Sequence, residues 1–364
     1  MWYPVLIPSL ALFSLSFCAS KGKELYPADT VPLRASYNFL VSGYNSQIAF
    51  YSYNDGLLNR TETLNVDPNL LWLEQVGESF YAIHDVNDFE GVQGGALSRW
   101  EQFNGGFYKR EYVSLQSPGP AHLLVDTDHN LVYTANYGGA SVTVVSSAAD
   151  GSLGDVVQVI KYGEGCRDVS HPHHVARSGD LVWIVDLGCD AVYHYKVDDG
   201  QLIKVGETAV EAGAGPRHMV VDEEREMVYL ACELKNFVQF YFADLNSGEL
   251  TLVTQLPIAP SDGSFAAEIL MSADKKVLYV STRGEGIIAA YNLPSQDGEI
   301  TKIQEFRVAG TWPRGVALRD NLMVAADQKG KSLQLIAVDP FNGLLSDLGS
   351  HETPSDPGFV LFYD

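Results

Sequence analysis

Short apolar segments separated by polar turns recur along the chain and predict β-strands. In one unit, Pro216-Arg-His-Met-Val-Val is followed after a polar turn by Met227-Val-Tyr-Leu-Ala. An alternating segment that begins at Val238 and a fourth that begins at Leu250 complete this unit. The segments lack the 3.6-residue periodicity of amphipathic helices, so the pattern predicts units of four short antiparallel strands.

The four-strand unit repeats along the chain, with a spacing typical of the blades of a β-propeller. Similar units start at Pro68, Pro120, Pro172, Pro216, Ala266 and Pro313. Pro357 opens a seventh unit that has a first strand only, whereas the segments at Asn38 and Ile48 read as second and third strands without a first. The sequence therefore predicts an all-β, seven-bladed β-propeller, closed by the C-terminal strand joining the N-terminal blade, because closure removes exposed sheet edges.

The charge balance limits the partners that such a propeller can have. The 364 residues include 46 acidic and 24 basic side chains, which gives a net charge of -22. Nucleic acids and anionic membrane surfaces require a basic face, so we expect neither as a partner. A small anionic ligand stays compatible with this composition if the few arginines gather where it binds.

The amino terminus has the pattern of a secretory signal. An apolar run from Val5 to Phe17 is too short to cross a bilayer, and small residues follow it at Ala19 and Ser20. We expect a signal peptide at residues 1–20 and a propeller domain at residues 21–364, hence a secreted protein; a buried start of the fold is the alternative. Asn59 begins an Asn-Arg-Thr sequon suited to glycosylation.

Three cysteines follow the expected signal. Cys166 precedes the Pro172 strand and Cys189 follows the second strand of the same unit, so both should lie on one face and a disulfide is feasible. Cys232 falls inside a predicted strand and is typical of a buried apolar residue.

Two positions of each unit should surround one mouth of the central channel, because antiparallel neighbours bring the start of one strand beside the end of the next. The position after each unit start holds Asn69, Ala121, His173, Arg217, Ala267, Arg314 and Gly358. The position that closes each second strand holds Gly43, Tyr137, Leu187, Glu233, Arg283 and Gln328, with the second unit ambiguous around Asp85. Polar and charged types at matched positions indicate an asymmetric site on a symmetric scaffold.

Several of these residues lie in segments that resemble a known family. Gly215-Pro-Arg-His-Met, Ala231-Cys-Glu-Leu, Ser281-Thr-Arg-Gly, Trp312-Pro-Arg-Gly and Ala325-Ala-Asp-Gln-Lys are similar to motifs of the 6-phosphogluconolactonase/lactonase family of seven-bladed propellers. The resemblance covers residues 35–364 and extends to fungal carboxy-cis,cis-muconate cyclases. It implies a catalytic set of His173, Glu233, Arg217 and Arg283.

The resemblance implies hydrolysis of a sugar-acid lactone, as in 6-phosphogluconolactonases, with a small anionic lactone or carboxylate as substrate. Glu233 would be the base, His173 the proton donor or shuttle, and the two catalytic arginines would hold an oxyanion. We expect substrate contacts from Arg314, Gln328 and Tyr137. The alternatives are a carboxy-cis,cis-muconate cyclase, which closes a lactone, and a non-catalytic binding propeller.

Other interpretations of the same residues remain open. Arg217 and Glu233 are also compatible with a structural ion pair, Arg314 with stacking near Trp312, and Gln328 with an ordinary turn.

The histidines raise a separate question of metal binding. His171, His173 and His174 lie near Asp168, but their spacing is not that of a standard zinc site. Phosphate-binding and dinucleotide motifs are absent from the sequence, so we expect no metal and no cofactor. His122 and His218 follow the site positions by one residue and should point away from them, making hydrogen bonds between blades.

Overall fold

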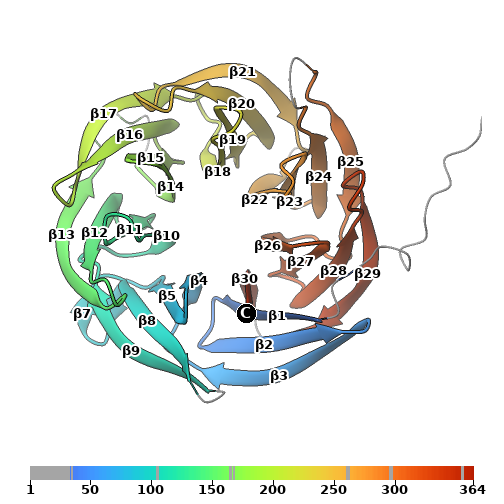
Figure 1. The fold of residues 1–364 in the computed structure, drawn as a ribbon, viewed down its shortest axis with the longest axis horizontal. Coiled ribbons are helices and arrows are strands. Elements are labelled where there is room, and N and C mark those ends of the chain that lie inside the picture. The colour runs from blue at the N-terminus through green and yellow to red at the C-terminus, as the bar shows by residue number, and fades with distance from the viewer. Residues whose placement is uncertain are drawn as a thin grey trace, which may run out of the picture.

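The computed structural model describes residues 33, 36–103, 106–163, 166, 169–259, 263–294, 298–353 and 356–364. The expected signal segment, residues 1–20, lies outside the described residues, and so does Asp168. The described part is all-β and has seven four-stranded antiparallel sheets, which are arranged in a ring around a common axis (Figure 1). The predicted seven-bladed propeller is confirmed.

Blades are numbered here from the one that contains the amino-terminal strands, and strands are given from the channel outward. Blade 1 consists of β30 (Pro357–Tyr363), β1 (Ser36–Gly43), β2 (Gln47–Asn54) and β3 (Leu57–Asn65). Blade 2 consists of β4 (Leu70–Val76), β5 (Ser79–His84), β8 (Ala96–Phe103) and β9 (Gly106–Ser114). Blade 3 consists of β10 (Pro120–Asp126), β11 (Leu131–Asn136), β12 (Ser141–Ser147) and β13 (Leu153–Lys161).

The other four blades follow in chain order. Blade 4 consists of β14 (Pro172–Ser178), β15 (Leu181–Asp186), β16 (Ala191–Asp198) and β17 (Gln201–Ala209). Blade 5 consists of β18 (Pro216–Asp222), β19 (Met227–Cys232), β20 (Phe237–Ala243) and β21 (Leu250–Pro257). Blade 6 consists of β22 (Phe265–Met271), β23 (Val277–Arg283), β24 (Ile287–Asn292) and β25 (Lys302–Arg307). Blade 7 consists of β26 (Pro313–Arg319), β27 (Leu322–Asp327), β28 (Ser332–Val338) and β29 (Leu345–Glu352).

Blade 1 closes the ring in the predicted way. The C-terminal strand β30 pairs antiparallel with β1, with Phe39 opposite Phe362 and Leu40 opposite Leu361. The rings of Phe39 and Phe362 meet edge to face with centroids 5.6 Å apart. The two ends of the chain are therefore held together by a full strand ladder and by aromatic packing.

The core is divided among the junctions between blades. The described residues form seven apolar clusters, and each cluster combines side chains of two neighbouring blades. Between blades 4 and 5, for example, the fully buried Trp183 packs in a cluster with Leu230. Every blade covers the face of the next, so the alternating apolar pattern is satisfied all the way around the ring.

A β-bulge on the innermost strand aims side chains toward one end of the channel. In blade 4, Pro172 pairs with Asp186 and His174 with Val185, so that His173 has no partner on β15. Six of the seven inner strands share this arrangement, and the unpaired residues are Leu71, Ala121, His173, Arg217, Arg314 and Gly358. The bulge changes the direction in which these side chains point.

The expectation of Asn69 at this position was wrong. In blade 2 the inner strand begins at Leu70, two residues after Pro68, so Leu71 takes the matched position. The same blade departs from the repeat in a second way, because the short hairpin of β6 (Asp88–Phe89) and β7 (Val92–Gln93) is inserted between β5 and β8.

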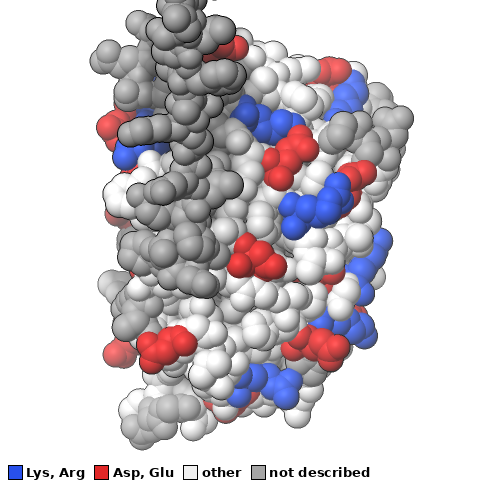
Figure 2. All heavy atoms as spheres, turned by 90° about the vertical axis from the view of Figure 1, so that its right-hand side faces the viewer, with Lys and Arg blue, Asp and Glu red and all other residues white. Residues whose placement is uncertain are grey.

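The outer surface carries charges of both signs. On the side of the molecule shown in Figure 2, Lys and Arg side chains are interspersed with Asp and Glu rather than gathered in a patch. On β25, for example, Lys302 pairs with Glu305, and Arg307 pairs with Glu285. The described residues contain no helix that is long and apolar enough to span a membrane.

Candidate functional site

A pocket of about 350 Å³ lies at the end of the channel toward which the bulges point. Its wall contains residues of two kinds: residues at the inner-strand bulges and residues that follow the second strands. The lining residues are Tyr44, Leu71, Asp85, Asn87, Gly119, Ala121, Tyr137, Gly138, His173, Glu233, Arg283 and Arg314. The two matched positions of the repeat thus meet in one pocket, as the sequence predicts.

Charge is distributed unevenly around this pocket. Blades 5, 6 and 7 supply Glu233, Arg283 and Arg314, whereas blades 1 to 4 supply the carboxyl group of Asp85 and otherwise only uncharged groups. The cationic side therefore faces a side of hydroxyl groups, one imidazole and one carboxylate.

Glu233 is held between two guanidinium groups. It follows β19, and its backbone N–H donates to the carbonyl oxygen of Gly215 at 2.7 Å. Its Oε2 lies 2.7 Å from Nη2 of Arg283 and 3.2 Å from Nε of Arg217. Both contacts use the same carboxylate oxygen, so Glu233 fixes the positions of the two arginines.

Arg217 lies behind Glu233 and does not line the pocket. Its side chain is only 3% exposed, and Nη1 donates to the carbonyl oxygen of Ala267. Burial, together with the positive charges of Arg283 and Arg314, lowers the pKa of Arg217 to about 9. The guanidinium is thus charged at neutral pH, and its charge is balanced locally by Glu233.

Arg314 differs from the other two arginines because it makes no ion pair with any described residue. Its Nη2 donates to the hydroxyl of Tyr44 at 2.6 Å, and its guanidinium lies 5.1 Å from the centre of that ring. Burial raises the pKa of the Tyr44 phenol, so Tyr44 stays uncharged. A guanidinium that lacks a carboxylate partner in a pocket is suited to bind an anionic group.

His173 contributes an uncharged imidazole to the pocket wall. The residue is 5% exposed, and its Nδ1 has no hydrogen-bond partner among the described residues. Burial and then the charge of Arg217 hold the pKa of His173 well below its ordinary value. Tyr137 lies edge-on to this ring, with centroids 5.7 Å apart.

Three more histidines fill the channel below the pocket. His218 of blade 5 lies 2.9 Å from Oε1 of Glu268 in blade 6, and His122 of blade 3 accepts the N–H of Val175 in blade 4 at 3.4 Å. The predicted hydrogen bonds between blades are confirmed. The ring centres of His122 and His174 lie 4.0 Å apart. Burial raises the pKa of Glu268, the partner of His218, to about 7.

The structure brings together five of the seven residues expected in the site: Tyr137, His173, Glu233, Arg283 and Arg314. Arg217 is adjacent to them through Glu233. Gln328 directly follows β27 but does not line the pocket; its backbone N–H donates to the carbonyl oxygen of Trp312 at 3.1 Å.

Sequence reasoning missed Tyr44, which holds Arg314, and did not assign Asp85. Gly43 pairs with Pro357 in the same way that Cys232 pairs with Pro216, so the position that matches Glu233 is Tyr44, one residue later. The apolar pattern alone does not show which residue of blades 1 and 2 takes the matched position. A glycine ends β1, and a glycine-rich insertion follows β5.

Cys166 and Cys189 form a disulfide bond in the structure, with Cα atoms 4.7 Å apart, and Cys232 is a buried free thiol. Together with Asp186, these two cysteines make up a cluster with metal-like spacing, but their sulfur atoms are bonded to each other. Asn59 is exposed on the outermost strand of blade 1. The disulfide and the exposed Asn59 are compatible with the expected secretion, which stays a prediction.

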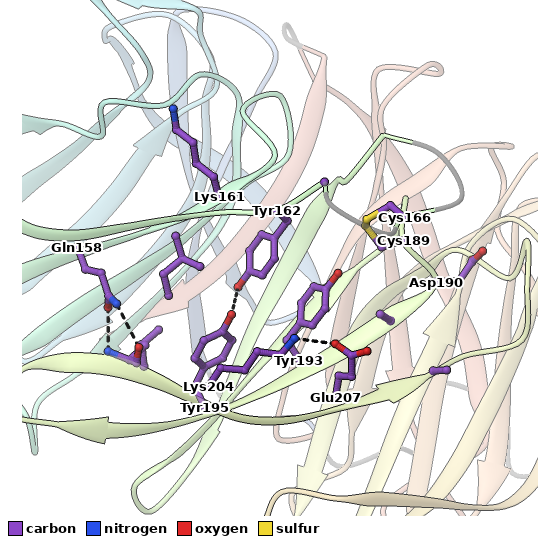
Figure 3. A pocket seen from close by; sticks show the side chains of 15 residues that line it. Gln158, Lys161, Tyr162, Cys166, Cys189, Asp190, Tyr193, Tyr195, Lys204 and Glu207 are labelled. Atoms are coloured by element: carbon purple, nitrogen blue, oxygen red, sulfur yellow. Dashed lines mark hydrogen bonds and ion pairs between the residues drawn. A yellow bond between two sulfur atoms is a disulfide. The ribbon is translucent and has the colours of Figure 1, made fainter.

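A larger groove of about 920 Å³ lies beside this disulfide, between blades 3 and 4 (Figure 3). Several of its polar groups are engaged with one another: the hydroxyls of Tyr162 and Tyr195 are 2.8 Å apart, and Lys204 pairs with Glu207. The aromatic rings of Tyr162 and Tyr193, which both line this groove, stack face to face. The smaller channel pocket, with an unpaired arginine, is therefore the better candidate site.

Fold and site together define a seven-bladed propeller with a small pocket, lined by two arginines, at one end of its channel. Residues 36–362 match the family model described as lactonase, 7-bladed beta-propeller, and the chain belongs to this family.

Named relatives agree with this family. A 6-phosphogluconolactonase of Bacillus subtilis is 28% identical over 77% of this chain and 83% of its own length. A solved structure of a Lactobacillus plantarum protein has a TM-score of 0.83 at 28% identity, covering 90% of this chain and 100% of the other. The periplasmic gluconolactonase of Pseudomonas aeruginosa shares the fold, with a TM-score of 0.82 at 24% identity over 90% of this chain and 99% of its own.

Proposed function

We propose that this protein hydrolyses the lactone of an anionic sugar acid, of the type of 6-phosphogluconolactone. The observation that carries the proposal is the unpaired guanidinium of Arg314 in a pocket whose other arginine is fixed by Glu233. A pocket of about 350 Å³ suits a single sugar ring. The names of the relatives support a lactone as the substrate class.

Hydrolysis of a lactone needs a water molecule that loses a proton, donors for the oxyanion that develops at the carbonyl, and a proton for the leaving ring oxygen. In this proposal Arg314 binds the anionic group of the substrate, and Arg283 faces the developing oxyanion. His173, which is uncharged, donates or accepts a hydrogen bond beside them. In these roles, Arg314 lies beside the negative charge that the substrate already carries, and Arg283 lies beside the oxygen on which negative charge develops.

The geometry does not favour the expected role of Glu233 as a free base. Its Oε2 lies in contact with Arg283 and Arg217, so its negative charge is balanced by two guanidinium groups. We assign to Glu233 the positioning of Arg283, and to Arg217 the support of Glu233 from behind. The secure anchoring of Arg217 to the Ala267 carbonyl fits this supporting role.

The test measures ring opening of 6-phosphogluconolactone by pH-stat titration, with uncharged gluconolactone and carboxy-cis,cis-muconate as comparison substrates. We expect the wild type to open the phosphorylated lactone, and Glu233→Gln to lose about 100-fold or more of kcat/KM because the oxyanion donor is no longer held. Glu223→Gln, in the exposed turn after β18, is the matched control and should equal the wild type.

The outcomes separate the candidate functions. If no lactone is opened faster than the uncatalysed rate, the proposal fails. Turnover of carboxy-cis,cis-muconate alone would instead identify the protein as a cyclase, because ring closure needs the same carboxylate clamp.

A further inference from the structure

Asp85 is a second carboxylate in the pocket, and no expected role accounts for it. It follows β5 in blade 2, at the position that matches Glu233 in blade 5. Three blades separate the two residues, which is the largest separation that a ring of seven allows. The two carboxylates therefore enter the pocket from nearly opposite walls.

The environments of the two carboxylates differ. Glu233 is fixed by two arginines, whereas the carboxylate of Asp85 makes no hydrogen bond or ion pair with any other described residue. The groups that share the pocket with Asp85 and carry or can carry a charge are Tyr44, Tyr137, His173, Glu233, Arg283 and Arg314. Burial raises the pKa of Asp85, and the charge of Arg314 opposes this shift.

The backbone of Asp85 is held in place even though its carboxylate is unengaged. Its N–H donates to the carbonyl oxygen of Asn69 at 2.9 Å, and its own carbonyl oxygen accepts Nδ2 of Asn69 at 2.9 Å. The next residue, Val86, accepts the N–H of Gly119 at 3.0 Å. A group that is precisely placed yet has free lone pairs is what proton transfer in a binding pocket requires.

We infer that Asp85 is the general base and acid of the lactonase reaction, a catalytic residue distinct from Glu233; this inference rests on the proposed function. The oxygen of a water molecule bonds to the carbonyl carbon while Asp85 takes one of its protons. The bond between that carbon and the ring oxygen then breaks, and Asp85 returns the proton to the ring oxygen, which leaves as a hydroxyl. The carboxylic acid that results gives its proton to solvent.

Two carboxylates thus have two roles that their surroundings determine. The paired carboxylate of Glu233 orients a cation, and the unpaired carboxylate of Asp85 moves a proton. Asn69 is the positioning residue for Asp85, which gives a function to a residue that does not itself line the pocket.

The test compares wild type, Asp85→Asn and Asp85→Glu in kcat and KM for 6-phosphogluconolactone across pH. Asp85→Asn preserves size and should lower kcat by about 100-fold or more with little change in KM, and the acid limb of the wild-type pH profile should disappear. Asp85→Glu should recover part of kcat. Asp88→Asn, an exposed residue whose Oδ1 accepts the N–H of Gly91, is the matched control and should behave as wild type.

Two failures can be told apart. If the wild type opens lactones and Asp85→Asn keeps its kcat within about threefold, or keeps the acid limb, Asp85 is not the base and the proposed function stands. If the wild type itself opens no lactone above the uncatalysed rate, the proposed function fails together with this inference. Circular dichroism of each variant shows that a loss of rate is not a loss of fold.

Discussion

Arg314 is the side chain on which the proposed preference of the pocket for an anionic substrate rests. Arg217 and Arg283 both contact Glu233, but the only side-chain partner of Arg314 among the described residues is the neutral hydroxyl of Tyr44. Its positive charge is therefore available to a ligand. Under the proposed function, this charge lets a chain with a net charge of -22 bind an anionic substrate.

We predict that Arg314→Gln weakens binding of an anionic lactone selectively. A charge-assisted hydrogen bond is worth about 1.5–3 kcal/mol, so KM for 6-phosphogluconolactone should rise roughly 10-fold to 100-fold, while KM for uncharged gluconolactone should change little. Steady-state kinetics on the two substrates measure the difference. Arg319→Gln, on the same strand but paired with Asp364, is the control. Equal losses on both substrates would contradict the assignment.

For single residues, the sequence predicted which side chains lie in the pocket better than it predicted what each of them does there. The repeat placed His173, Arg283 and Arg314 in one pocket because it matched strand starts and strand ends. The roles depend on contacts between blades that are far apart in sequence, such as the 270-residue separation between Arg314 and Tyr44. Spacing within a single blade carries no information on those contacts.

Strand β30 joins the two ends of the chain and so determines whether the ring is closed. Phe362 lies in the cluster between blades 1 and 7, and its ring meets those of Phe39 and Tyr37 edge to face. Its burial couples the last strand to strands at the start of the chain. Loss of this packing would destabilise the closure rather than one blade.

We predict that Phe362→Ala lowers the free energy of unfolding by about 3–5 kcal/mol, the usual range for truncation of a buried phenylalanine. Urea denaturation followed by tryptophan fluorescence measures this change. Phe341→Ala is the matched control, because Phe341 is 91% exposed, and it should change stability by less than about 0.5 kcal/mol. A similar small effect for both variants would show that closure does not depend on the packing of β30.

The strands themselves were predictable because each blade buries both of its faces and repeats one apolar pattern. The incomplete first and last units also predicted the closure correctly. Blade 2 was the exception: Pro68 precedes its inner strand by two residues, and the β6–β7 hairpin interrupts it. The bulges could not be predicted from the alternation, because a bulge changes the register by one residue without changing which residues are apolar.

On the scale of the whole molecule, the closed ring removes many titratable groups from water. Six of the nine histidines have a pKa below the ordinary value because they are buried: His84, His122, His173, His174, His194 and His218. For His84 burial lowers the pKa to about 4, and for His174 to about 3. Four of the six line or fill the central channel, so the channel is a site of uncharged imidazoles.

We predict that acid destabilises the folded ring well before most of its carboxylates are protonated. Below about pH 6.5 the unfolded chain takes up protons on these histidines and the folded chain does not, so the free energy of unfolding falls as pH decreases from about 6.5 toward 4. Two buried carboxyls, Glu74 and Glu268, act in the opposite sense. Burial raises the pKa of each to about 7, so between about pH 4.5 and 7 they favour the folded state more as pH falls.

The histidines outnumber these two carboxyls, so their effect should dominate, and the free energy of unfolding should drop by several kcal/mol between pH 7 and pH 5. Urea denaturation at half-unit steps of pH measures the slope, which reports the protons taken up on unfolding. His84→Gln should make the slope shallower by about one proton, or about 1.4 kcal/mol per pH unit. Stability that is unchanged from pH 7 to 5, or a slope that His84→Gln leaves intact, would show that the buried histidines keep their protons in the folded ring.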